Sequence, residues 1–436
     1  MAEAVARSIE GGRHLVVQAG TGTGKSLAYL VPAILSRRQV VVATATLALQ
    51  DQLAHHDLPL LEAGLEVPFT FAVLKGRSNY LCRQRAAEVQ AGRPGPRGAE
   101  DRPPPPLPPR DPSGAGEAGA PTERDVSTGP RSALGAELRR LLAWAARSST
   151  GDRAELDAEP SARAWAQLSV SAQECPGRSR CPSGDDCFAE AARDRAAQAD
   201  VVVVNMHLYS ADLASGRSVL PDHEVVVFDE AHELEDVATL GLGLELSRGR
   251  LRAMARLARG LLASSEAGPA GDLEHAGDRL EAALSPWSGR RLPPDLGEDV
   301  GAAVALAAER LRTLTAAVRQ AGAQSQGQGT LDLADRAGAL ADPTRTRALL
   351  AAGTLAGDLA TAMAGDPDRV AWVEERAGGA LTLRLAPIEV GPVLAKHLWG
   401  EVTAVLTSAT IPAGLPARLG LPADKSDELD VGSPFP

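Results

Sequence analysis

The residues best suited to chemistry lie in one glycine-rich stretch near the N-terminus, Ala19-Gly20-Thr21-Gly22-Thr23-Gly24-Lys25-Ser26. An apolar run precedes this stretch, and a helical pattern from Leu27 to Leu35 follows it. Strand, turn and helix in this order form a phosphate-binding loop, in which backbone N–H groups and the helix dipole surround phosphate oxygens. Lys25 would reach the β- and γ-phosphates, and the Ser26 hydroxyl would ligate Mg²⁺. The residues predicted to bind ATP and Mg²⁺ are therefore Gly20, Thr21, Gly22, Thr23, Gly24, Lys25 and Ser26.

Two neighbouring acids follow an apolar run much later in the chain. Val225-Val226-Val227-Phe228 reads as a buried strand, and Asp229-Glu230-Ala231-His232 comes directly after it. Asp229 would hold Mg²⁺ and Glu230 would act as the general base on water, which is the arrangement of a Walker B site. His232 would lie near the γ-phosphate and link hydrolysis to nucleic-acid contacts. The alternative is an ordinary helix start, since acids favour a first helical turn.

A third motif closes the last apolar strand, Val402 to Leu406, which runs into Thr407-Ser408-Ala409-Thr410. Serine and threonine commonly end strands, so this signal is weak by itself. Together with the two earlier motifs, it predicts that Ser408, Ala409 and Thr410 couple nucleotide hydrolysis to movement.

The chain has four cysteines, and the last three recur at intervals of six residues: Cys82, Cys175, Cys181 and Cys187. Structural disulfides are uncommon in cytosolic proteins, so metal ligation explains these thiols better. Four thiolates could hold zinc or an iron–sulfur cluster. Structural zinc sites usually have two close cysteine pairs, and one distant cysteine with a loose triplet fits a cuboidal cluster better. Four unconnected thiols remain the alternative.

The elements around these motifs predict an α/β fold with a parallel, doubly wound sheet. Apolar strands are expected at Gln39 to Thr44, Phe69 to Leu74 and Ala199 to Met206. A helical pattern opened by a hydroxyl residue occupies Ala45 to Leu53. Strands that alternate with helices in units of this size form parallel sheets, and such sheets bind ligands at the carboxyl ends of their strands.

Two long stretches interrupt this pattern. Residues 91–133 are rich in proline and glycine without apolar periodicity, which predicts a disordered insertion before a short helix at Leu138 to Ala146. From Leu234 to about Ala364 the chain is expected to be helical throughout. Short apolar segments at Val370 to Val373 and Leu381 to Leu385 suggest that the sheet resumes there.

Composition limits the partners and the compartment. The 436 residues carry a net charge of −11, which does not support bulk electrostatic binding of nucleic acid, so any such contact must use a local groove. The chain shows no signal segment and no apolar run of membrane-spanning length, and the expected localisation is cytoplasmic. A row of arginines is expected to be a solvated helix face, with a nucleic-acid surface as the alternative: Arg248, Arg250, Arg252, Arg256 and Arg259.

Taken in order, the phosphate-binding loop, Thr44 to Gln52, Asp229 to His232 and Ser408 to Thr410 resemble the motifs of superfamily 2 helicases. Four cysteines before Asp229 and a helical insertion after it resemble the DinG/XPD group of iron–sulfur DNA helicases. The bacterial DinG branch is the more similar one. Three further segments support that branch: Lys75 to Cys82, the Asn205-x-His207 step, and Val431 to Pro436.

This resemblance implies ATP hydrolysis coupled to 5′-to-3′ movement on single-stranded DNA, in DNA repair or in the resolution of replication blocks. Its implied partners are single-stranded DNA and tailed or forked duplex DNA. A 4Fe-4S cluster would be held by Cys82, Cys175, Cys181 and Cys187. The implied fold is a RecA-like parallel sheet with an inserted iron–sulfur domain and an inserted helical, Arch-like domain. The expected boundaries are 1–75, 199–235 and 388–436 for helicase domain 1, 76–198 for the iron–sulfur domain and 236–387 for the Arch-like domain.

The family pattern also includes a glutamine-bearing segment before the phosphate-binding loop and a second RecA-like domain with arginine fingers. Neither is expected within these 436 residues. The stretch is therefore expected to be the ATP-binding half of the motor, and a nucleotide- and DNA-binding fragment without helicase activity is the alternative. A zinc-binding P-loop ATPase of another class is a further alternative.

Overall fold

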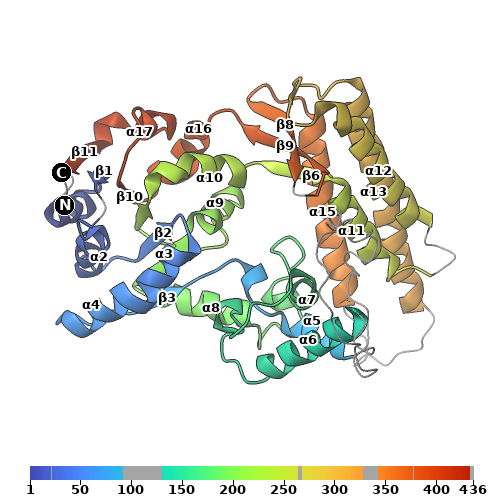
Figure 1. Cartoon of the computed structure of the whole chain (residues 1–436), viewed down its shortest axis with the longest axis horizontal. Helices are drawn as coiled ribbons and strands as arrows, with labels where there is room; N and C mark the ends of the chain where they lie inside the picture. Colours follow the sequence, from blue (N-terminus) through green and yellow to red (C-terminus); the bar gives the residue numbers. More distant parts are fainter. Residues whose placement is uncertain (21, 92–129, 264–267, 328–341, 377, 433–436) are drawn as a thin grey trace, which may run out of the picture.

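The computed structural model describes residues 1–20, 22–91, 130–263, 268–327, 342–376 and 378–432. The predicted disordered insertion at 91–133 lies almost wholly outside these residues, as do Thr21 and the last four residues of the chain. Figure 1 shows a sheet unit that holds both ends of the described chain, a helical unit, and a segment with several short helices (α5 to α8) between them.

The sheet unit is built on seven strands in the order β11-β1-β10-β5-β2-β4-β3. All of the neighbouring strands in this sheet are parallel. The strands are β1 (His14–Ala19), β2 (Val40–Thr44), β3 (Phe71–Val73), β4 (Val201–Asn205), β5 (Val225–Asp229), β10 (Thr403–Ser408) and β11 (Ser426–Gly432). Unbroken valine runs form the central strands because both of their faces are buried. The predicted parallel α/β sheet is therefore confirmed.

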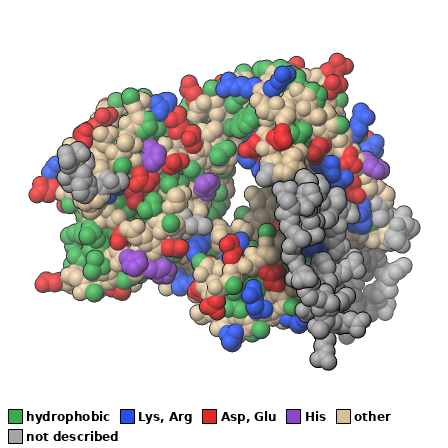
Figure 2. All heavy atoms as spheres, in the orientation of Figure 1, with side chains coloured by type: hydrophobic (Ala, Val, Ile, Leu, Met, Phe, Trp, Pro, Cys, Tyr) green, Lys and Arg blue, Asp and Glu red, His purple; other side chains and the backbone are tan. Residues whose placement is uncertain are grey.

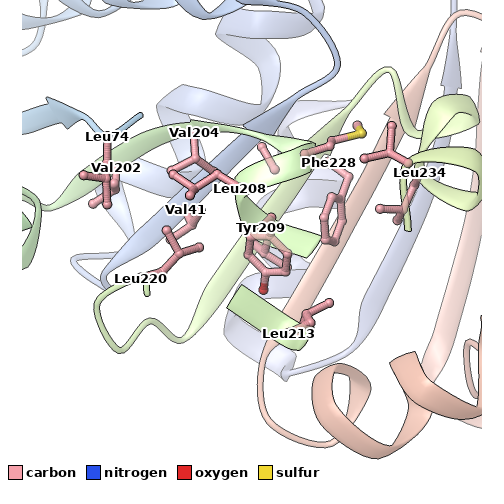
Figure 3. Close-up of a cluster of buried hydrophobic side chains, with 14 of the residues drawn as sticks. Val41, Leu74, Val202, Val204, Leu208, Tyr209, Leu213, Leu220, Phe228 and Leu234 are labelled. Atoms are coloured by element: carbon pink, nitrogen blue, oxygen red, sulfur yellow. The ribbon is translucent and has the colours of Figure 1, made fainter. Parts of the chain in front are cut away.

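Helices cover both faces of this sheet. One face packs on α1 (Ala2–Gly11), α2 (Lys25–Leu35), a π-helical turn (Leu53–Asp57) and α4 (Leu58–Gly64). The other face packs on α9 (Met206–Ala214) and α10 (Leu234–Gly241), where Tyr209 and Phe228 meet edge to face (Figure 3). Shorter elements of this unit are α3 (Leu47–Gln52), a 3-10 turn (Ala231–Glu233), α16 (Gly391–Leu394), a π-helical turn (Ala395–Trp399), α17 (Leu415–Arg418) and a 3-10 turn (Ala423–Lys425).

The helical unit has its own hydrophobic core and its own sheet. Its helices are α11 (Arg248–Arg259), α12 (Gly268–Leu284), α13 (Glu298–Gly327) and α15 (Pro343–Met363), with a 3-10 turn at Ser285–Trp287. Its four strands are antiparallel, in the order β6-β9-β8-β7: β6 (Leu244–Ser247), β7 (Arg291–Leu292), β8 (Arg369–Arg376) and β9 (Ala380–Pro387).

Two expectations for this region were wrong. The strands around Val370 and Leu381 do not return to the main sheet, because β8 and β9 pair with each other and with β6 and β7. The region from Leu234 to Ala364 is not helical throughout, since it contains β6 and β7. An alternating apolar pattern predicts a half-buried strand but does not identify the partner of that strand.

Most of the arginine row on α11 is neutralised within the helical unit, as expected of a solvated helix face. Arg248 and Arg252 pair with Asp278 of α12, and Arg250 pairs with Asp358 of α15.

The segment that contains the cysteines packs on the sheet unit. Its helices are α5 (Arg83–Gln90), α6 (Pro130–Ala145), α7 (Ala162–Leu168) and α8 (Phe188–Ala197), with 3-10 turns at Arg77–Asn79, Arg153–Glu155 and Arg178–Arg180. Leu141, Trp165 and Phe188 join one continuous core with the β-strands. The predicted helix at Leu138 to Ala146 overlaps the longer α6, which begins at Pro130 and ends at Ala145. In the described part of the chain, no helix has the length and apolarity needed to cross a membrane.

Candidate active site

Strand register brings the predicted motifs to one edge of the sheet. Asp229 at the end of β5 lies opposite Thr407 of β10, and Thr407 lies opposite Val17 of β1. Asp229 also lies opposite Thr44 at the end of β2. Since all of these strands are parallel, their carboxyl ends meet at the same edge, beside the glycine-rich turn that follows β1.

The glycine-rich turn has the backbone of a phosphate-binding loop. Gly22 and Gly24 have φ angles of 78° and 73°, which side-chain-bearing residues rarely adopt. The Thr23 hydroxyl donates to the carbonyl oxygen of Gly20 at 2.8 Å and fixes the turn from within. Gly24 is the N-cap of α2, so Lys25 and Ser26 begin that helix. These features place helix N–H groups toward the edge at which Asp229 lies.

A chain of polar contacts joins three of the motifs. The Lys25 ammonium lies 2.9 Å from Oε1 of Glu230, and the Ser408 hydroxyl donates to Oε2 of Glu230 at 3.1 Å. Nδ1 of His232 lies 2.8 Å from the Ser408 oxygen. Because the serine has one proton and gives it to Glu230, Nδ1 of His232 must carry the proton of that contact.

Glu230 has an unusual backbone conformation and a perturbed carboxyl group. Its φ of 61° lies in the left-handed region, which is uncommon for a residue with a side chain. Burial raises the pKa of Glu230, but the hydrogen bond and charge of Lys25 outweigh burial, so the net pKa is lowered. Glu230 is therefore an anion that points at the glycine-rich turn.

Asp229 is held from two sides. Its Oδ1 accepts the backbone N–H of Glu230 at 3.1 Å, and its Oδ2 accepts the hydroxyl of Tyr29 at 3.0 Å. Burial raises the pKa of Asp229, and the Tyr29 hydrogen bond opposes that shift. Burial also raises the pKa of Tyr29 well above its ordinary value, so the phenol remains a donor.

The structure therefore brings together Lys25, Asp229, Glu230, His232 and Ser408. Of the other predicted coupling residues, Ala409 is half-buried and Thr410 is exposed after the end of β10. Tyr29 was not predicted. Its position in the sequence could have indicated its role: Tyr29 follows Ser26 by three residues on a predicted helix, and residues three apart share a helix face.

All four cysteines line one cavity beside α5 and α8. The four residues are half-buried. Cys82 caps α5 and Cys187 caps α8, while Cys175 and Cys181 lie on the loop between α7 and α8. That loop is tightly folded, because a side chain at Gly184 would come within 2.1 Å of the carbonyl oxygen of Arg178. The four cysteines thus share one cavity, and their role as ligands stays a prediction.

Most of the arginines of this cavity are held in ion pairs: Arg77 with Glu190, Arg178 with Asp194 and Arg347 with Glu88. Burial, with a smaller contribution from the other three cysteines, raises the pKa of the Cys82 thiol to about 11. Four arginines line the cavity with one acidic residue, Glu190; the arginines are Arg77, Arg83, Arg178 and Arg347. In the parts of the chain that the structure describes, no three histidine, cysteine or acidic side chains are grouped closely enough to hold a metal ion.

Comparison with known proteins gives consistent results. A family model described as DEAD/DEAH box helicase matches residues 2–90. The ATP-dependent helicase DinG of Mycobacterium tuberculosis (strain ATCC 25177 / H37Ra) is 37% identical over 456 residues, which cover 100% of this chain and 63% of that protein. The chain therefore spans less than two thirds of the length of this relative.

Another sequence relative and a solved structure are also similar to this chain. The ATP-dependent DNA helicase YoaA of Escherichia coli (strain K12) is 37% identical over 261 residues, which are 59% of this chain and 36% of that protein. A solved structure titled "XPD_Helicase" aligns with a TM-score of 0.52 at 14% identity, over 98% of this chain and 61% of that one. At this low identity the structural match indicates the fold alone. The chain is therefore similar in sequence to DinG and YoaA helicases, part of it matches the DEAD/DEAH box helicase model, and its fold is similar to that of the XPD helicase structure.

Proposed function

We propose that these residues form the ATP-binding half of a DinG-type DNA helicase, in which ATP hydrolysis drives 5′-to-3′ movement on single-stranded DNA during repair or at replication blocks. The observation that carries this proposal is the meeting of Lys25, Asp229, Glu230 and Ser408 at one edge of a parallel sheet. The domain boundaries given above belong to the same proposal.

The hydrogen bonds that join Lys25, Glu230, Ser408 and His232 suggest how nucleotide binding activates the general base. Lys25 pairs with Glu230 in this structure, and both side chains are largely shielded from water. Phosphate oxygens of ATP would compete for Lys25 and draw it away from Glu230. The released Glu230 carboxylate could then take a proton from water as the water oxygen attacks the γ-phosphorus and the bond to the β-phosphate oxygen breaks. Glu230 would therefore become available as a base when substrate is present.

Ser26 and Asp229 would hold Mg²⁺, which when bound neutralises charge on the phosphates. The residues present fit this ion, because a hydroxyl and a carboxylate are hard oxygen ligands of the kind that Mg²⁺ prefers. Ser408 is hydrogen-bonded to Glu230, and His232 is hydrogen-bonded to Ser408. A change in the charge or position of Glu230 would therefore shift both side chains and alter their contacts with the rest of the motor.

We further propose that Cys82, Cys175, Cys181 and Cys187 hold a 4Fe-4S cluster. The observation that supports this proposal is the one cavity that all four thiols line. A cuboidal cluster binds each thiolate through a different iron, so its ligands need not converge on one ion. When bound, such a cluster would crosslink α5, α8 and the loop before α8.

DNA would contact a central groove of about 740 Å³ between the three parts of the molecule, where the space-filling view shows an opening (Figure 2). The groove is lined by α9, by the loop after α7, and by α11 and α15. Its charged residues are balanced: Arg85, Arg250 and Arg347 against Glu174, Glu245 and Asp358. The groove is a local hollow with three arginines but no net positive charge, so DNA phosphates would have to compete with the acidic residues for those arginines.

An ATPase assay of residues 1–436 tests the proposal. We expect Mg²⁺-dependent nucleotide binding and slow hydrolysis that single-stranded DNA stimulates. A chain that binds no nucleotide in the presence of Mg²⁺ would contradict the proposal.

A further inference from the structure

Tyr29 is a fully buried residue whose hydroxyl reaches the candidate metal site. It lies on α2 with none of its surface exposed. Its hydroxyl donates to Oδ2 of Asp229 at 3.0 Å, across 200 positions of sequence. Ser26 lies three residues earlier on the same helix, so the two side chains share a helix face. The Tyr29 phenol therefore contacts Asp229, one of the two side chains proposed to hold Mg²⁺, and lies on the helix that carries the other, Ser26.

Asp229 depends on few groups for its orientation. Only 4% of its surface is exposed, so water cannot replace a lost partner easily. The backbone N–H of Glu230 and the Tyr29 hydroxyl each bind one of its two oxygens. Each oxygen keeps another lone pair for a metal or for a metal-bound water. The two donors therefore fix the plane of the carboxylate and leave its metal-binding capacity free.

The hydroxyl is the part of Tyr29 that packing does not require. The ring fills a place in the apolar core between α2 and the sheet, which phenylalanine could fill equally well. A buried hydroxyl is unfavourable unless it is hydrogen-bonded. Its hydrogen bond to Asp229 thus calls for an explanation at the site rather than in the core.

We propose that Tyr29 is a positioning residue for Mg²⁺: its hydroxyl holds Asp229 in the orientation that receives the ion together with the nucleotide. This inference rests on the proposed function and adds a residue to it. Groups that orient metal ligands commonly contribute about tenfold or more to metal affinity. Tyr29 therefore sets the Mg²⁺ concentration at which the site binds nucleotide tightly.

The test compares Tyr29→Phe with wild type in the full chain, using binding of a fluorescent ribose-labelled ADP titrated with Mg²⁺. We expect the half-saturating Mg²⁺ concentration to rise by about tenfold in Tyr29→Phe. Binding measured in EDTA should stay within about twofold of wild type, because the Lys25 contact and the phosphate-binding loop do not need the hydroxyl. Unchanged binding in EDTA also shows that the variant is folded.

Tyr209→Phe is the matched control. Tyr209 is equally buried on the other face of the sheet, and its hydroxyl lies 2.9 Å from Nε2 of His223, away from the metal site. A shift in Mg²⁺ dependence that is the same in both variants would overturn the inference, as would no shift in Tyr29→Phe or an equal weakening in EDTA. If wild type shows no Mg²⁺-dependent nucleotide binding, the proposed function fails, and this inference fails with it.

Discussion

Arg347 of α15 binds Glu88 of α5 through two hydrogen bonds, Nη1 to Oε1 at 2.9 Å and Nη2 to Oε2 at 2.8 Å. The two residues are 259 positions apart and almost completely buried. Arg85 adds a third hydrogen bond to the same carboxylate at 2.8 Å. Because Arg347 lines both the cysteine cavity and the central groove, this pair ties the helical unit to the segment that contains the cysteines.

Removing Arg347 should destabilise the chain strongly. Arg347→Met would leave Glu88 buried with fewer partners, and breaking a buried ion pair in this way costs about 3 kcal/mol. We expect the thermal unfolding midpoint to fall by roughly 5 °C or more, measured by circular dichroism. Arg259→Met is the matched control, since Arg259 pairs with Glu274 on the surface and such pairs contribute about 1 kcal/mol or less. Equal midpoints for the two variants would contradict the assigned role.

The ion pair of Glu88 and Arg347 predicts that the stability of the protein depends on pH. Burial raises the pKa of Glu88, but the hydrogen bonds and charge of Arg347 outweigh burial and lower the net pKa below its ordinary value of 4.5. A carboxyl group with a lowered folded-state pKa stabilises the protein above its unfolded pKa, and it loses that contribution as the pH falls through the folded value. The stability difference between wild type and Glu88→Gln should therefore be largest near neutral pH and shrink below pH 4.5. Denaturation of both proteins across this range measures the difference, and a gap that widens in acid would refute the prediction.

Lys25→Ala and Glu230→Gln should affect nucleotide handling differently. Lys25 neutralises phosphate charge, so Lys25→Ala should lose most ATP binding. Glu230→Gln should bind ATP at least as well as wild type, because it no longer holds Lys25 as an ion pair, while hydrolysis falls by about 100-fold or more. Equilibrium binding and single-turnover hydrolysis separate the two effects. A similar loss of affinity in both variants would show that the roles are misassigned.

Protein purified without oxygen should be brown, with broad visible absorption and about four irons per chain. Cys181→Ser should lose the colour and loosen residues 76–199 in hydrogen exchange, because cluster binding and local folding are linked. Ser183→Ala, two residues away, is the control that should keep the iron. Stoichiometric zinc without visible absorption would overturn the cluster assignment.

Residues 1–436 assayed alone should bind single-stranded DNA in preference to duplex, and the binding should weaken steeply with salt because phosphate contacts dominate. Nucleotide binding should persist, since Lys25, Asp229 and Glu230 meet at one edge of the parallel sheet. We expect slow turnover and no separation of a 5′-tailed duplex. Robust ATP-dependent strand separation by this chain would refute the prediction.

The sequence by itself determined the local elements of this protein. Valine runs identified the buried strands that became β2, β4 and β5, because a strand buried on both faces must be apolar along its whole length. The glycines around Lys25 and the acids after Val225–Phe228 could also be predicted from sequence alone. Each of these motifs is short, and its function requires particular residues at fixed spacing.

Only the tertiary structure decided which distant segments meet. The pattern of Val370 to Val373 gave a strand but not its antiparallel partner, since register depends on contacts outside the strand. The contact of Tyr29 with Asp229 and that of Glu88 with Arg347 join residues 200 and 259 positions apart. No local periodicity encodes such pairs. They form because a polar group that is buried without a hydrogen bond is unfavourable. The packing of whole helices and strands determines which partner lies close enough to bind it.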